Sequence, residues 1–173
     1  GNAEWLVAEI DESDGTIDLF SPEISVIVNL DHDHHARYET AEDYQKVFER
    51  LAQRTRSSVI FDAAFAGAFR ESERLTQAEF LSLGKDGSCA WEASRLAGGW
   101  SSLSLRGAVA VSDVLINRNG VMNQLDAAFA LAAASKAGCE LRSGQVFEFR
   151  SVKRRQRSYY NSPRIQIFDD YAH

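Results

Sequence analysis

The fold is decided by the stretch that runs from Ile24-Ser-Val-Ile-Val-Asn29, through a helical pattern at residues 41–54, to Ser58-Val-Ile-Phe61. The first and last segments are short, apolar and rich in β-branched residues, which is typical of buried strands. Strands of this kind alternate with helices in parallel sheets, and the helices cover both faces of the sheet. The stretch therefore predicts an α/β fold with three αβα layers and a mostly parallel sheet.

The helix at residues 41–54 is predicted from local signals. Thr40 stands three residues before Asp43, with the spacing of a capping box. Four apolar residues then recur at the i, i+3, i+4, i+7 spacing of one helical face; they are Tyr44, Val47, Phe48 and Leu51.

Elements on both sides extend this core. The apolar run Trp5–Ile10 predicts a buried strand, and residues 63–80 predict a further helix with a loop. Residues 88–117 scatter apolar residues among Gly and Ser, which predicts a small antiparallel β patch. A helix from about Met122 to Lys136 and a last strand at Ile165–Phe168 complete the expected order.

Composition excludes several classes of protein. The 173 residues are 45% hydrophobic and carry a formal net charge of -6, so the chain has no general attraction to nucleic acid or to an anionic membrane. No apolar run approaches the roughly 18 residues of a membrane span. The start has no signal-peptide pattern, and Cys89 and Cys139 fit two reduced thiols, so we expect a cytoplasmic protein. The abrupt ends suggest a piece of a longer protein.

Carboxylates cluster in Glu9-Ile-Asp-Glu-Ser-Asp14, and five of them lie between Glu9 and Asp18. Ligands of open α/β sheets bind at the carboxyl ends of strands, and a divalent cation relieves the repulsion between neighbouring carboxylates. A solvated acidic loop is the alternative. Because Glu9 lies inside an apolar run, we expect it to be partly buried and to need a partner.

A second ligand-rich segment is Asn29-Leu-Asp-His-Asp-His-His35, which again follows a predicted strand. His34 and Glu9 would then share one edge of the sheet, where one ion could touch both. Three alternatives compete: a hydrated loop, an adventitious nickel or zinc affinity, and a helix N-terminus that uses Asp33. Magnesium prefers oxygen ligands, so a histidine ligand would be unusual.

Two later segments have possible nucleotide roles. Lys153-Arg-Arg-Gln-Arg157 is a basic patch that could bind phosphate through arginine forks, or could be ordinary surface charge. Gly120-Val-Met-Asn123 opens the predicted helix. Asn123 either caps that helix or faces a nucleotide base.

Taken together, these motifs resemble the central domain of the Mur ligases, which form amide bonds. The resemblance is carried, in the family's order, by Val7–Gly15, Ser21–Asn29, Asp33-His34, Gly120-x-x-Asn123, Lys153-Arg-Arg155 and Asp169-Asp170-Tyr-Ala-His173. It implies that residues 1–168 are part of an ATP-binding domain and that residues 169–173 begin the junction to a C-terminal domain.

The resemblance also implies cofactors and site residues. The cofactors are ATP and Mg²⁺. Glu9 and His34 match the magnesium ligands and catalytic positions, Asn123 the adenine contact, Arg155 a phosphate contact and Asp170 an acid near the ribose.

The form of the first and last motifs is most similar to ligases that join L-alanine to UDP-N-acetylmuramate through an acyl phosphate. Two departures stand out. The family's phosphate loop, ending in Gly-Lys-Thr/Ser, is absent from the sequence, so we expect this chain alone to be inactive. Met122 and Asp126 replace the usual His and second Asn.

Three alternatives remain. The first is a related ligase that adds a peptide or another amino acid. The second is a non-catalytic metal- or nucleotide-binding module, in which Asp31, His32, His34 and His35 would bind zinc. The third is a purely structural domain.

Overall fold

The computed structural model describes residues 4–149 and 157–169, and its main sheet has seven strands. The strands follow one another across the sheet in chain order: β1 (Ile24–Ile27), β2 (Ser58–Asp62), β3 (Glu79–Leu83), β4 (Cys89–Arg95), β5 (Ser101–Gly107), β6 (Val111–Ile116) and β7 (Val146–Phe147). Pairing is parallel from β1 to β4 and from β6 to β7, and antiparallel from β4 to β6. The predicted mostly parallel sheet and the antiparallel patch at residues 88–117 are both confirmed.

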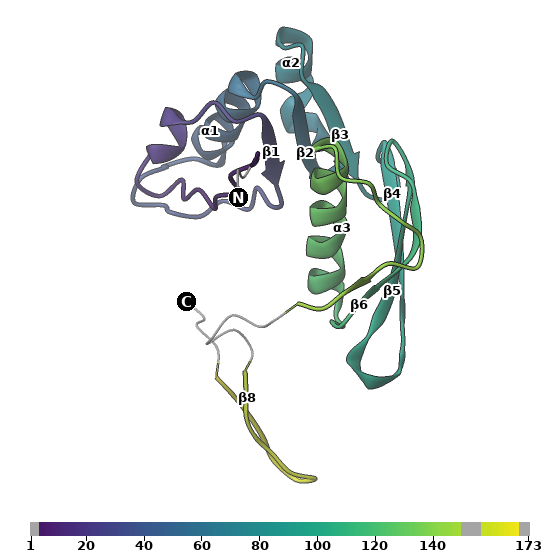
Figure 1. Ribbon diagram of the computed structural model, residues 1–173. Helices are drawn as coiled ribbons and strands as arrows, with labels where there is room; N and C mark the ends of the chain where they lie inside the picture. The colour runs from purple at the N-terminus through teal and green to yellow at the C-terminus, as the bar shows by residue number, and fades with distance from the viewer. Residues whose placement is uncertain (1–3, 150–156, 170–173) are drawn as a thin grey trace.

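Helices cover the sheet on two sides, as Figure 1 shows. Helices α1 (Ala41–Arg54) and α2 (Ala66–Leu75) lie on one face, and α3 (Val121–Lys136) lies on the other. Strand β2 shows the reason, because Val59 and Phe61 belong to the core under α1 and α2, whereas Ile60 belongs to the core under α3. Alternating side chains of a strand point to opposite faces, so a strand covered on both faces is apolar throughout.

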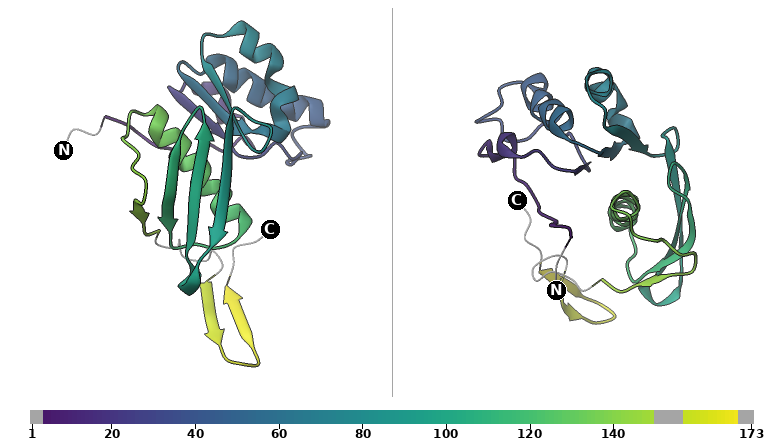
Figure 2. Two further views of the ribbon diagram at one scale, coloured as in Figure 1. Left: turned by 90° about the vertical axis from the view of Figure 1, so that its right-hand side faces the viewer. Right: turned by 45° about the horizontal axis from the view of Figure 1, so that its top comes forward.

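The antiparallel strands β4–β6 have a different environment. Their inner face packs on α3 through fully buried Leu103, Leu105 and Val114. No described helix covers their outer face, which is turned to the viewer in the left panel of Figure 2. A one-sided sheet of this kind needs apolar residues on only one face, which explains the mixture with Gly and Ser.

The helix ends follow the local sequence. Thr40 caps α1, since its side chain accepts a hydrogen bond from the backbone N–H of Asp43 at 3.1 Å. Gly138 has a φ of +86° just after α3, in the left-handed region that favours glycine at a helix C-terminus. Three short 3₁₀ helices also form: η1 (Thr16–Leu19), η2 (Ala63–Phe65) and η3 (Ala97–Gly99).

A separate antiparallel hairpin consists of β8 (Arg157–Asn161) and β9 (Gln166–Asp169). Only β9 was expected from the sequence, at Ile165–Phe168. Strands β3, β7 and β8 are additional. Cys89 is buried, Cys139 is exposed, and both are free thiols. Within the part of the chain that the structure describes, no helix has the length and apolar character needed to cross a membrane.

One predicted element is wrong. Trp5–Ile10 is not a strand but an extended, irregular segment in which Leu6 and Val7 are more than 90% exposed. An apolar run becomes a strand only when it pairs with a neighbour, and among residues 4–149 and 157–169 the only strand that pairs with β1 is β2.

Candidate functional site

The acidic loop before η1 is shaped by its own side chains. Asp11 Oδ1 accepts a hydrogen bond from the backbone N–H of Ser13 at 2.7 Å, and Asp14 Oδ1 accepts one from that of Thr16 at 2.8 Å. Gly15 then turns the chain with a φ of +81°. Aspartate side chains commonly cap their own backbone two residues on, so the sequence itself specifies this turn.

These hydrogen bonds also act on the charges. The pKa of the Asp11 carboxyl lies below its ordinary value, mainly because of the hydrogen bonds from Ser13 and, to a smaller extent, because of nearby His34. The pKa of Asp14 is lowered in the same way by Thr16. The loop therefore presents ionised carboxylates at neutral pH.

The histidine-rich loop leaves β1 and places His34 in an unusual conformation. His34 has a φ of +54°, in the left-handed region that non-glycine residues rarely adopt. Its N–H donates to Asp33 Oδ1 at 2.7 Å, and its carbonyl accepts from the N–H groups of Arg37 and Tyr38 at 2.8 and 3.1 Å. Residues 35–37 form a turn rather than a helix, so the alternative of a helix N-terminus at Asp33 is wrong.

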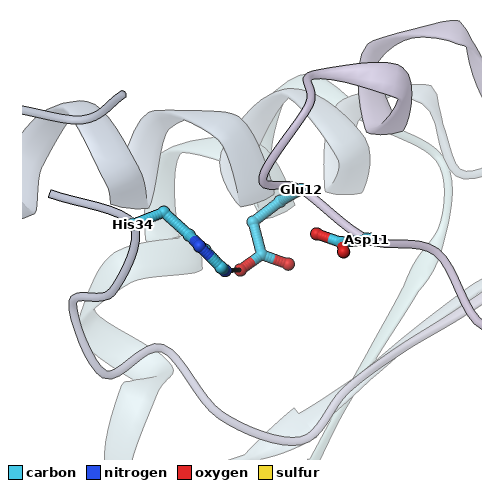
Figure 3. A group of neighbouring side chains, drawn as sticks. All are labelled: Asp11, Glu12 and His34. Atoms are coloured by element: carbon cyan, nitrogen blue, oxygen red, sulfur yellow. Dashed lines mark ion pairs between the residues drawn. The ribbon is translucent and has the colours of Figure 1, made fainter. Parts of the chain in front are cut away.

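The two loops meet at Asp11, Glu12 and His34, which Figure 3 shows. One ligand atom from each residue lies within 4.8 Å of the others, and His34 Nε2 lies 3.2 Å from Glu12 Oε1. The side chain of Glu12 is 17% exposed and that of His34 is 37% exposed. Two carboxylates and an imidazole at this spacing suit a divalent cation, because carboxylates are good ligands for Mg²⁺ and an imidazole adds a nitrogen donor.

Glu12 is also held from helix α1 and from the histidine-rich loop. Tyr44 Oη, on α1, donates to Glu12 Oε1 at 2.9 Å, and Tyr38 Oη donates to the main-chain carbonyl of Glu12 at 2.6 Å. Burial raises the pKa of Tyr44 well above its ordinary value, and the Glu12 carboxylate raises it further. The phenol therefore stays protonated and remains a donor.

Glu9 differs from the sequence-based expectation. It is exposed rather than partly buried, because the segment around it is not a strand, and it lies outside the three-residue group. Asp11 and Glu12 stand in the same motif but had been given no role of their own. The helical spacing predicts Tyr44 only as a core residue, and its hydroxyl is the one sequence signal of a polar partner.

The other histidines of the loop do not join the group. The rings of His32 and His35 meet edge to face, with centroids 4.3 Å apart, and His32 Nε2 lies 2.9 Å from the carbonyl oxygen of Tyr38. Among the residues that the structure describes, the site that a metal could use therefore contains His34 and excludes its two neighbours.

The predicted nucleotide contacts are only partly described. Asn123 is exposed on the first turn of α3, and its Nδ2 donates to the carbonyl of Asn119 at 2.8 Å. The residue at the N-cap is Gly120, so Asn123 does not cap the helix. Arg155 and Asp170, with Lys153 and Arg154, lie outside the described residues.

Comparisons with known proteins identify the family. Residues 1–134 match the Mur ligase middle domain. A UDP-N-acetylmuramate--L-alanine ligase of Mycolicibacterium vanbaalenii is 31% identical over 185 residues, covering all of this chain and 39% of that protein. The ligase of the same name from Gloeobacter violaceus is 32% identical over 181 residues, covering all of this chain and 38% of that protein.

Solved structures show the same fold. MurF from Acinetobacter baumannii has a TM-score of 0.70 at 19% identity, covering 91% of this chain and 36% of that one. A mutant of the L. casei enzyme FPGS has a TM-score of 0.63 at 16% identity, covering 90% and 40%.

This chain therefore spans less than two fifths of the length of these curated relatives. The family match covers more than three quarters of the 173 residues, and it includes both loops of the site. The chain belongs to the Mur ligase middle-domain family.

Proposed function

We propose that this chain is the part of an ATP-dependent carboxylate–amine ligase that holds magnesium and one side of the nucleotide. The observation that carries the proposal is the meeting of Asp11, Glu12 and His34 in a chain of the Mur ligase middle-domain family. Surface acidic loops are common, but this loop is folded against a histidine from a second loop.

The proposed magnesium ligands are His34 and Glu9, with Asp11 and Glu12 as neighbouring carboxylates. A bound Mg²⁺ would neutralise charge on the transferring phosphoryl group, which is a dominant requirement of phosphoryl transfer. The chain's own contribution is to supply anionic oxygens and one imidazole nitrogen at one place. Glu9 is exposed, so its carboxylate is open to an ion.

The proposed nucleotide contacts are Asn123 with adenine, Arg155 with the phosphates and Asp170 near the ribose. Two structures with the same fold support a nucleotide here. MurF from Thermotoga maritima was solved with ADP, and FPGS was solved with AMPPCP. The exposed amide of Asn123 is compatible with this role, since it is open to a ligand.

The proposed reaction of the full-length protein joins L-alanine to UDP-N-acetylmuramate, in the cytoplasm. ATP transfers its γ-phosphoryl group to the carboxylate of UDP-N-acetylmuramate, which gives an acyl phosphate and ADP. The amine of L-alanine then attacks the acyl carbon, the amide bond forms and phosphate leaves. The names of the relatives that cover the whole chain support this choice of substrates.

The test is a panel of amines with the full-length protein. We expect phosphate release from ATP in the presence of UDP-N-acetylmuramate to require L-alanine and to stay at background with other amino acids, a dipeptide or a tripeptide. Equal or greater turnover with one of the others would place the protein in a different branch of the family.

A companion test concerns the 173-residue chain by itself. Because its sequence contains no Gly-Lys-Thr/Ser motif, we expect no phosphate release that depends on ATP and L-alanine. Such release from the isolated chain would contradict this proposal. Equilibrium dialysis with zinc, magnesium and ATP tests the non-catalytic alternative, which predicts zinc binding that does not depend on nucleotide.

A further inference from the structure

We propose that Glu12, itself held by Tyr44, is a positioning residue that orients the imidazole of His34 through its Nε2 atom. The consequence for metal binding rests on the proposed function, in which His34 is a magnesium ligand. The orientation itself does not, because it follows from contacts between residues of this chain.

The first step is that Glu12 is fixed more firmly than a surface carboxylate. Its Oε1 accepts the hydroxyl of Tyr44 at 2.9 Å, and its main-chain carbonyl accepts the hydroxyl of Tyr38 at 2.6 Å. Tyr44 is only 5% exposed and packs on Phe48 and Tyr38 with ring centroids 5.1 and 5.4 Å away. The carboxylate is therefore tied to the core of the α1 face.

The second step is that the backbone of His34 is held in a strained conformation. Non-glycine residues with a positive φ are uncommon and persist where the surroundings over-determine them, often at functional sites. In the described residues only His34 and Asp113 adopt such a conformation. Three backbone hydrogen bonds hold His34 there, one through its N–H and two through its carbonyl.

The third step is the contact between the two side chains. Nε2 of His34 lies 3.2 Å from Glu12 Oε1, so the carboxylate faces the far end of the imidazole ring. A carboxylate that faces a nitrogen of a histidine in this way restricts the orientation of its ring.

The fourth step separates this arrangement from an ordinary surface ion pair. Exposed pairs contribute little and leave both side chains free to rotate. Glu92 and Arg106 form such a pair on the open face of the antiparallel strands, with side chains 60% and 71% exposed. Glu12 is 17% exposed and has a buried tyrosine as a second partner, so it can act as a fixed support.

The experiment measures the order of the His34 ring in the metal-free 173-residue chain by carbon-13 relaxation. We expect a ring order parameter near the rigid value of about 0.85 in the wild-type chain, and below about 0.6 in Glu12→Ala. Glu12→Gln should restore most of the order, because the side chain keeps its shape and its amide oxygen can still accept from the Tyr44 hydroxyl. Glu92→Ala is the matched control and should leave the His34 ring unchanged.

Tyr44→Phe carries the same prediction if Glu12→Ala fails to fold, since it keeps the buried ring and removes only the hydroxyl. A His34 ring that is already mobile in the wild-type chain would overturn the proposal. A folded Glu12→Ala chain whose His34 ring is as ordered as in the wild type would also overturn the proposal. If Tyr44→Phe replaces that variant, the same result in the folded Tyr44→Phe chain would overturn it.

Titration with Mn²⁺ then links the positioning to the proposed function. Loss of a supporting partner typically weakens metal binding about 10- to 100-fold, so Glu12→Ala should weaken Mn²⁺ binding by that factor and Glu12→Gln by less. If His34→Ala leaves Mn²⁺ binding unchanged, the proposed metal site fails, while the result for ring order still decides the positioning.

Discussion

At the scale of single residues, Asp18 attaches the end of the acidic loop to α1. Asp18 pairs with Arg50 at 3.0 Å and with Arg54 at 3.2 Å, and Arg54 also donates to the carbonyls of Ile17 and Phe20. The hydrogen bond and the charge of Arg50, followed by those of Arg54, lower the pKa of Asp18. The loop that presents Asp11 and Glu12 thus has its end fixed on the helix that carries Tyr44.

The Asp18→Asn variant tests this attachment. We expect the free energy of unfolding at neutral pH to fall by roughly 0.5–1 kcal/mol, a modest value because the Asp18 side chain is 41% exposed. A lowered pKa stabilises the fold above the ordinary aspartate pKa, and this contribution is lost as the pH falls through the lowered value.

The difference between the two proteins should therefore become smaller in acid, when urea unfolding at neutral pH is compared with unfolding below the ordinary aspartate pKa. Asp86→Asn, at an exposed position, is the control. An undiminished difference in acid would show that the ion pairs do not carry the effect.

The motif that contains the site could be predicted from residue types, but its geometry could not. The proximity of His34 to the acidic segment was predicted correctly, because both segments are loops rich in possible metal ligands. The expectation that Glu9 is partly buried was wrong, since it rested on an apolar run that resembles a strand. Whether such a run is buried depends on a pairing partner, and periodicity alone does not supply that information.

At the scale of elements, α1 connects the two loops to the sheet. The bounds Ala41–Arg54 agree with the prediction because the cap and the apolar face are both local signals. Strand β3 was missed because Glu79–Leu83 mixes polar and apolar residues, and its position is set by pairing with β2, which is distant in sequence. Strand β7 has only two residues, too few to form a pattern.

The cap of α1 gives a prediction for this scale. Thr40→Ala removes the side chain that accepts from the N–H of Asp43, so we expect the free energy of unfolding to fall by about 1 kcal/mol. Thr40→Ser keeps a hydroxyl and should remain close to the wild type in the same denaturation experiment. Equal losses in both variants would indicate that the methyl group of Thr40 matters rather than its hydrogen bond.

At the scale of the whole molecule, α3 joins the parallel and antiparallel parts of the sheet. The two parts pair between β3 and β4 at one register position, where Leu83 lies opposite Cys89. The core under α3, however, contains Ile60 and Leu81 from the parallel strands and Leu103 from the antiparallel strands. The small, fully buried side chains of Ala128 and Ala132 allow α3 to lie close to both parts of the sheet. We therefore expect the parallel and antiparallel parts to unfold together.

Leu103→Ala tests this cooperation. Truncation of a fully buried leucine costs about 2–5 kcal/mol, and we expect one urea transition at which helical circular dichroism and tryptophan fluorescence change together. Leu96→Ala, at a position 40% exposed, should change the free energy of unfolding by no more than about 0.5 kcal/mol. Separate transitions for the two signals would mean that α3 does not unite the sheet.

The central claim is that the acidic loop and His34 form the metal-binding side of a ligase site. Its most direct test is the steady-state rate of phosphate release by the full-length protein with ATP, UDP-N-acetylmuramate and L-alanine. We predict that Glu9→Ala and His34→Ala each lower this rate at least ~10²-fold through loss of metal-borne charge stabilisation, while Glu92→Ala leaves it unchanged. Near-normal turnover in both site variants would contradict the account.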